Sequence, residues 1–130
     1  MRVAILESII MPAGHEVEFD RLIINELKRQ GHEPVLMVPE GFTFKVDYGV
    51  EVLYLAGGPV VTYAGASRWK KPFLSILREK RRRGWFNSAA RLIKEHRCDA
   101  IIIPTATYRY VKALFDTALK HAQVPVHLLF

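Results

Sequence analysis

The sequence has 130 residues, of which 50% are hydrophobic, 11% aromatic and 25% charged, and its 19 lysines and arginines against 13 acidic residues give a net charge of +6. This composition is that of one soluble globular domain, which excludes a disordered chain, and no stretch approaches the roughly 20 apolar residues of a membrane span. The single cysteine, Cys98, excludes an intrachain disulfide, so we expect a reducing, cytoplasmic setting.

The first half of the chain reads as strand, helix, strand and strand. An apolar run at 3–6 predicts a buried strand, and 16–30 predicts an amphipathic helix that Gly31 ends. The apolar residues at helical spacing in it are Phe19, Leu22, Ile23 and Leu27. Two further apolar runs, at 34–38 and 50–55, predict the second and third strands, since proline or glycine residues bound them.

In the second half, a long glycine-containing loop precedes a basic helix that begins near Pro72. Asn87 or Ser88 is expected to cap a separate helix that runs to about residue 97. The remaining elements are predicted as a strand at 100–103, a helix at 108–121 and a strand at 124–130.

Strands that alternate with helices predict right-handed crossovers and a parallel sheet. We therefore expect an α/β, Rossmann-like three-layer fold with about five parallel strands in the order 3-2-1-4-5. Because the sequence stops within the apolar run Leu128-Leu129-Phe130, we expect either a fragment of a longer protein or a subunit whose partner covers this edge.

In such sheets, ligands bind beyond the carboxyl ends of the strands, near the point where the strand order reverses. The three loops expected there are residues 7–15, 56–67 and 104–110. The first contains Gly14 but no GxGxxG pattern, and the helix after it opens with the acidic residues Glu16, Glu18 and Asp20. Those acids would repel a pyrophosphate, so we expect no dinucleotide site of the usual kind.

Two short motifs flank the first predicted helix. The loop Met11-Pro12-Ala13-Gly14-His15 precedes it, and the turn Gly31-His32-Glu33-Pro34-Val35 follows it and leads into the second strand, which closes at Pro39. Together these segments resemble the opening of a GT-B glycosyltransferase, in which a Gly-His loop and a Gly-His-Glu-Val-like turn have this spacing. Residues 98–103 and 124–126 are similar to the fourth and fifth strands of that family.

The resemblance implies that residues 1–130 are one Rossmann-like domain, the N-terminal acceptor-binding half of a two-domain enzyme. The implied partner is a C-terminal domain or subunit that binds most of the nucleotide sugar, the co-substrate. The implied acceptor is a glycan or lipid-linked molecule, as in cell-envelope polysaccharide biosynthesis, and no metal or other cofactor is implied.

The resemblance also implies a role for His15. In inverting members of the family, the histidine of the Gly-His pair is the general base for the acceptor hydroxyl, and this role maps onto His15. The proline that often follows that pair is absent here. Retaining members use no histidine base, so both stereochemical outcomes stay open, and His15 could instead fill the first helical turn.

Five residues at the expected carboxyl edge are candidate contacts to the acceptor or donor: Glu7, Gly14, Thr105, Thr107 and Tyr108. Glu7 could orient a hydroxyl or His15, or bond to its own loop. Gly14 would allow close approach of a ligand to the backbone, or is a plain turn residue. The two threonines and Tyr108 could line a pocket or cap the next helix.

The positive charge is confined to one segment. Residues 68–83 contain eight basic residues and one acid, a net +7 that leaves −1 for the rest of the chain. Aromatic and apolar residues are interleaved with the basic ones, and the resemblance includes peripheral enzymes on lipid acceptors. We therefore expect an anionic membrane surface as a partner, on the inner face of the plasma membrane. The predicted membrane-surface residues are Arg68, Trp69, Lys70, Lys71, Arg81, Arg82, Arg83 and Trp85.

Three alternatives remain for this segment and this fold. The basic helix could be solvated, with its apolar residues packed on the sheet. The chain could be a non-catalytic Rossmann-like module whose basic helix binds a partner protein or nucleic acid, although the sequence has no recognised nucleic-acid motif. A flavodoxin-like or nucleotide-binding stress protein is disfavoured because the loops lack phosphate-cradling glycines and hydroxyls.

Overall fold

The computed structural model describes most of the chain. The described residues are 1–7, 14–40, 42, 47–56, 69–104, 112, 114, 117, 121 and 123–129. The elements are β1 (Arg2–Leu6), α1 (Gly14–Arg29), β2 (Glu33–Pro39), β3 (Glu51–Leu55), α2 (Lys71–Glu95), β4 (Ala100–Ile103) and β5 (Val126–Leu128). The helix expected over 108–121 falls largely outside the described residues.

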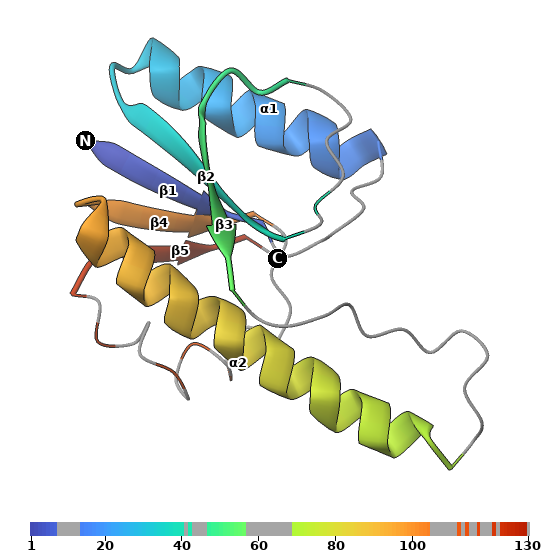
Figure 1. Cartoon of the computed structure of the whole chain (residues 1–130). Helices are drawn as coiled ribbons and strands as arrows, with labels where there is room; N and C mark the ends of the chain where they lie inside the picture. The colour runs from blue at the N-terminus through green and yellow to red at the C-terminus, as the bar shows by residue number, and fades with distance from the viewer. Residues whose placement is uncertain are drawn as a thin grey trace.

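The five strands form one sheet in the order β3-β2-β1-β4-β5, and every neighbouring pair is parallel. Helix α1 covers one face of the sheet and α2 the other, as Figure 1 shows. The predicted α/β, Rossmann-like fold class and strand order are therefore confirmed. The order reverses direction at β1, whose two neighbours are β2 and β4, so the carboxyl end of β1 is the place where a ligand site is expected.

The core has two layers because successive strand residues face opposite sides of the sheet. On the α1 side, Ile5 of β1 packs with Val17 and Ile24 of the helix. On the α2 side, Leu6 packs with Phe86 and its neighbours on that helix. Short, continuously apolar strands are thus covered on both faces, as is usual for parallel sheets.

Helix α1 ends as its sequence predicts. Gly31 has a positive φ of 84°, which a residue without a side chain adopts at little cost. The N–H of His32 donates to the carbonyl of Leu27 at 2.9 Å, and that of Gly31 donates to Lys28 at 3.0 Å. These two hydrogen bonds are the Schellman arrangement that closes a helix at glycine.

The predicted buried face of α1 is partly wrong. Phe19 and Leu22 are exposed, whereas the face toward the sheet is formed by Val17, Asp20 and Ile24. Both sets satisfy helical spacing, and the sequence favoured the set that contains no acid. The carboxyl group of Asp20 therefore lies within an otherwise apolar layer.

A second correction concerns α2, which is one continuous helix of 25 residues and not two. Ser88 does not cap a new helix; its hydroxyl accepts a hydrogen bond from the backbone N–H of Ala56 at 3.0 Å. Serine and asparagine weaken a helix mainly by bonding to their own backbone, and Ser88 has another partner. The helix consequently continues through Gly84 and Asn87.

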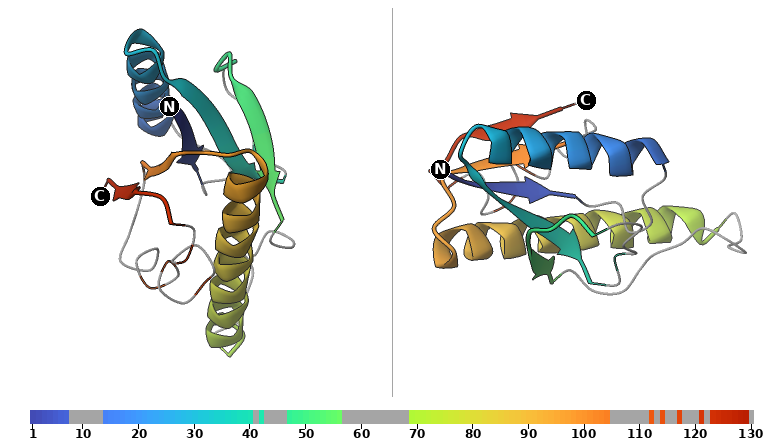
Figure 2. Two further views of the ribbon diagram at one scale, coloured as in Figure 1. Left: turned by 90° about the vertical axis from the view of Figure 1, so that its left-hand side faces the viewer. Right: turned by 90° about the horizontal axis from the view of Figure 1, so that it is seen from above.

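The first part of α2 and the two residues before it extend past the carboxyl edge of the sheet (Figures 1 and 2). We call residues 69–80 the overhang. Three of its apolar side chains are open to solvent, with Trp69 84%, Phe73 63% and Ile76 66% exposed, whereas Leu74 and Leu77 are partly buried. Further along the same helix Trp85 and Phe86 are buried in the core, because there the helix lies against the strands.

Candidate functional site

The carboxyl edge of the sheet brings together two of the predicted site segments. Glu7 follows β1, and its N–H donates to the carbonyl of Met37 at 2.9 Å, which extends the pairing with β2 by one residue. Helix α1 begins at Gly14, which puts His15 in its first turn. The His15 side chain lies outside the described part of the structure, as do Arg68, Thr105, Thr107 and Tyr108.

Glu7 belongs to a buried polar cluster, defined here as Glu7, Asp20 and Tyr48. Glu7 is two residues after Ile5 and so continues the strand face toward α1, where Asp20 is also fully buried. Tyr48 packs into the same layer. Burial, with added repulsion from the carboxylates of Asp20 and Glu7, raises the pKa of the Tyr48 phenol to about 12.

Two members of this cluster are functional candidates that the sequence did not reveal. Asp20 is one of the three acids with which the predicted helix opens. Its spacing of three residues after Val17 and four before Ile24 was the signal that it faces the sheet. Tyr48 stands beside Asp47 and Gly49 in a loop-like segment, and only the tertiary fold brings it beneath α1.

Replacing Tyr48 with phenylalanine is expected to make the chain more resistant to alkaline unfolding. The folded state keeps the phenol neutral up to a pKa of about 12, whereas the unfolded chain ionises it near pH 10. Above pH 10 the unfolded state binds fewer protons, so the wild-type chain loses roughly 2–3 kcal/mol between pH 10 and 12 through this group.

Urea unfolding at pH 7, 9 and 11 measures this difference. Tyr54→Phe, which removes an exposed hydroxyl, is the matched control. If the stability difference between wild type and Tyr48→Phe stayed constant across this pH range, the raised pKa would be refuted.

The predicted membrane-surface residues divide into three groups. Trp69, Lys70, Lys71 and Arg83 are exposed. Arg82 is partly buried and pairs with Glu79 at 3.4 Å. Arg81 and Trp85 are only 8% and 7% exposed, so the structure does not place these two residues at the surface, contrary to the prediction. The Arg81 guanidinium stacks over the Trp85 ring at 4.2 Å from its centroid.

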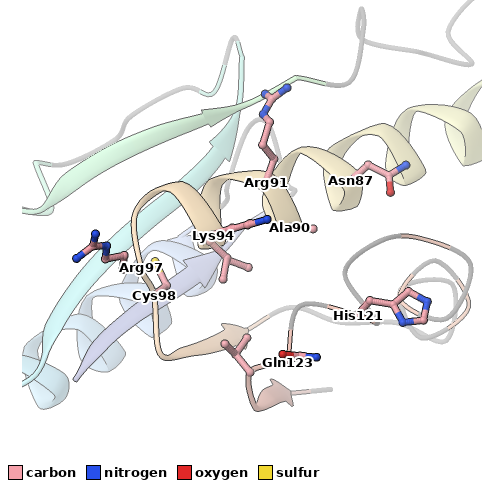
Figure 3. A pocket seen from close by; sticks show the side chains of 10 residues that line it. Asn87, Ala90, Arg91, Lys94, Arg97, Cys98, His121 and Gln123 are labelled. Carbon is pink, nitrogen blue, oxygen red and sulfur yellow. The ribbon is translucent and has the colours of Figure 1, made fainter.

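A cavity of about 660 Å³ lies between the C-terminal half of α2 and the residues that lead into β4 and β5 (Figure 3). It is at the amino end of these strands and so is distinct from the carboxyl edge. Arg91 and Arg97 belong to its lining, but their guanidinium groups point away from it. Because these two guanidinium groups point away from it and it lies at the edge of the sheet opposite the switch point, this cavity is a weaker site candidate than the carboxyl edge.

Within the ranges that the structure describes, no three histidine, cysteine, aspartate or glutamate side chains come together as a metal site. None of the helices described in this structure combines the length and apolar character needed to cross a membrane.

The sheet order, the crossovers and the switch point at β1 define a Rossmann-like domain. Solved structures with a similar fold include several glycosyltransferases. The glycosyltransferase SnogD from Streptomyces nogalater superposes with a TM-score of 0.62 at 17% identity, over 99% of this chain and 32% of SnogD. MurG from Acinetobacter baumannii gives a TM-score of 0.56 at 13% identity, over 98% of this chain and 34% of MurG. The chain therefore has the fold of a GT-B glycosyltransferase domain, as its sequence resemblance implied.

Proteins with other activities also have this fold. The C-terminal domain of the PF1911 hydrogenase from Pyrococcus furiosus matches with a TM-score of 0.57 at 12% identity, over 99% of this chain and 90% of that domain. No protein-family model and no curated protein matches the sequence. The chain spans about a third of the glycosyltransferases named above, so the remainder of such an enzyme has no counterpart in it.

Proposed function

We propose that this chain is the acceptor-binding domain of a glycosyltransferase that transfers a sugar from a nucleotide sugar to a lipid-linked or glycan acceptor. The observation that carries the proposal is the Gly14-His15 pair at the start of α1, beside the switch point of a GT-B-like sheet. The glycosyltransferases that share this fold support it. A partner domain or subunit would bind the donor.

The proposed chemistry at His15 is removal of a proton from the acceptor hydroxyl as that hydroxyl attacks the anomeric carbon. A histidine with a pKa near neutrality suits this step. The positive end of the α1 dipole favours the neutral imidazole that a base requires. Glu16 and Glu18 would oppose this effect, although the Glu18 carboxylate pairs with Arg21 at 3.2 Å.

The proposal assigns the donor to the partner because the α1 end of the carboxyl edge is acidic. Two buried carboxyl groups, Glu7 and Asp20, lie beneath the first turns of α1. This environment disfavours the phosphates of a nucleotide sugar at that helix start.

Titration calorimetry of this chain with nucleotide sugars is therefore expected to show no tight binding, with any dissociation constant weaker than about 1 mM. A panel of uridine, guanosine and thymidine diphosphate sugars covers the common donors. A micromolar dissociation constant for one of them, much tighter than that for inorganic pyrophosphate, would mean that the donor site lies in this chain.

The overhang supports a second element of the proposal, contact with an anionic membrane surface. Phe73 and Ile76 are three residues apart on α2 and so share one face, Trp69 lies just before the helix, and all three are exposed. Lys70 and Lys71 are exposed beside them and could reach lipid phosphates while their stems stay near the apolar surface. Each such charge contributes up to about 1 kcal/mol at an anionic leaflet.

Co-sedimentation with vesicles tests this contact. Wild-type chain is expected to bind phosphatidylglycerol vesicles and not phosphatidylcholine vesicles, and to bind less as salt is raised. Replacing Trp69, Phe73 and Ile76 together with serine should lower the vesicle affinity by at least about tenfold, since exposed apolar area is lost. The matched control is Leu22→Ser, an exposed leucine on α1. Equal binding to both kinds of vesicle, or binding to neither, would refute the proposed contact with an anionic membrane surface.

A further inference from the structure

Arg81 is a buried cation. Arg81 is only 8% exposed, and one face of its guanidinium group stacks on the Trp85 ring. Its Nε atom has no hydrogen-bond partner within the described part of the chain, and none of the ion pairs formed among the described residues includes Arg81. A guanidinium carries five N–H donors, so a stacking contact on its face leaves its hydrogen-bonding edges unused.

Among the residues that the structure describes, no acidic side chain forms an ion pair with Arg81. Glu79, the one acid of the basic segment, pairs with Arg82 at 3.4 Å and with Lys112 at 3.9 Å. Arg78, one turn earlier on the helix, is a second cation. Burial and the charge of Arg78 both lower the pKa of Arg81. A buried positive charge beside a like charge is costly, and an anion at that position would offset the cost.

Arg81 also lies in the region where ligands bind in this fold. The hydrogen bond between Ala56 and the Ser88 hydroxyl fixes that turn of α2 at the end of β3. Arg81 precedes Ser88 by seven residues, which is about 10 Å further along the helix axis and beyond the carboxyl edge. It is four residues before Trp85, so it continues the helix face that packs against the sheet.

We propose that Arg81 binds a phosphoryl group at the carboxyl edge, and that this group belongs to the acceptor. Trp85 fixes the plane of the guanidinium, and two parallel N–H groups on its edge would donate to two phosphoryl oxygens. The anion site is argued from Arg81 and its neighbours alone, whereas its assignment to the acceptor rests on the proposed function.

Calorimetric titration of inorganic pyrophosphate into this chain at low salt tests the site. Arg81→Met is expected to weaken binding at least tenfold, and Arg83→Met, which removes an exposed arginine two residues away, to change it less than threefold. Arg81→Met should also raise the melting temperature by about 3 °C, because it removes an uncompensated buried charge. Binding loss with a raised melting temperature separates a ligand site from damage to the fold.

Three results would overturn the anion site: no pyrophosphate binding by wild type, equal losses in the two variants, or a lower melting temperature for Arg81→Met. Binding to phosphatidylglycerol vesicles tests whether the phosphoryl group belongs to a membrane lipid instead of the acceptor. Arg81→Met is expected to bind them as wild type does, and loss of vesicle binding with it would overturn the acceptor assignment. If the chain bound pyrophosphate but the full-length protein transferred no sugar, the anion site would stand and the proposed function would be rejected.

Discussion

In the proposed two-domain glycosyltransferase, replacing His15 with alanine is expected to lower kcat by about 10²- to 10⁴-fold, the range typical for loss of a general base. The acceptor KM should change little, because the imidazole acts mainly on the proton that leaves in the transition state. Steady-state rates with donor and acceptor measure both constants. The acidic limb of the pH–rate profile, which reports protonation of the base, should disappear in the variant.

His32→Ala is the matched control for that experiment. His32 follows the C-terminal end of α1, at the opposite edge of the sheet, where its Nδ1 lies 3.2 Å from the N-terminal amine. Its removal should leave kcat within about twofold, as expected of a surface substitution away from the site. If His15→Ala retained a rate within a few-fold of wild type, His15 would be structural and a retaining mechanism would be favoured.

Phe86→Ala is expected to destabilise the chain by about 3–5 kcal/mol, the usual cost of removing a fully buried phenylalanine. Phe86 is completely buried at the centre of the layer between α2 and the sheet. Phe73→Ala, the same substitution on the overhang of the same helix, should change stability by less than about 0.5 kcal/mol. Urea unfolding curves give both values, with the slope of each transition as the check on two-state behaviour.

This comparison tests how α2 is divided between the core and the overhang. Similar costs for Phe73→Ala and Phe86→Ala would mean that both halves of the helix pack equally, which would contradict the exposed overhang. A small cost for both would mean that α2 does not cover its face of the sheet. Either result would also weaken the membrane proposal, since that proposal requires exposed apolar side chains at Trp69 and Phe73.

Most of the sheet could be predicted because its strands are short, apolar and bounded by breaking residues. The run at 100–103 predicted β4 with both boundaries correct, and Gly31 predicted the end of α1 through its backbone freedom. Strand order followed from the crossover rule, since alternating strands and helices leave few parallel topologies. These features depend on local sequence and chain connectivity, which a single sequence contains.

Side-chain orientation could not be predicted, because it depends on where each helix meets the sheet. Asp20 and Phe19 are one residue apart, and only the packed fold decides which of them faces β1. Within the basic segment, Trp69 and Trp85 are equivalent in composition, but one precedes the sheet edge and the other lies over the core. Charge counting likewise treated Arg81 and Arg83 alike, although only Arg81 is buried.

The position of β1 at the centre of the sheet also determines the order in which the chain can fold as it is synthesised. Val3 of β1 pairs with Pro34 of β2 on one edge. On its other edge Val3 pairs with Ala100 of β4, which is synthesised 97 residues later. Closing so long a loop is slow and entropically costly, so β1, β2 and β3 can assemble first with one open edge. The switch point between β1 and β4 is completed only when β4 leaves the ribosome. Until then the nascent chain exposes an unpaired edge of β1, the kind of surface that chaperones protect from aggregation.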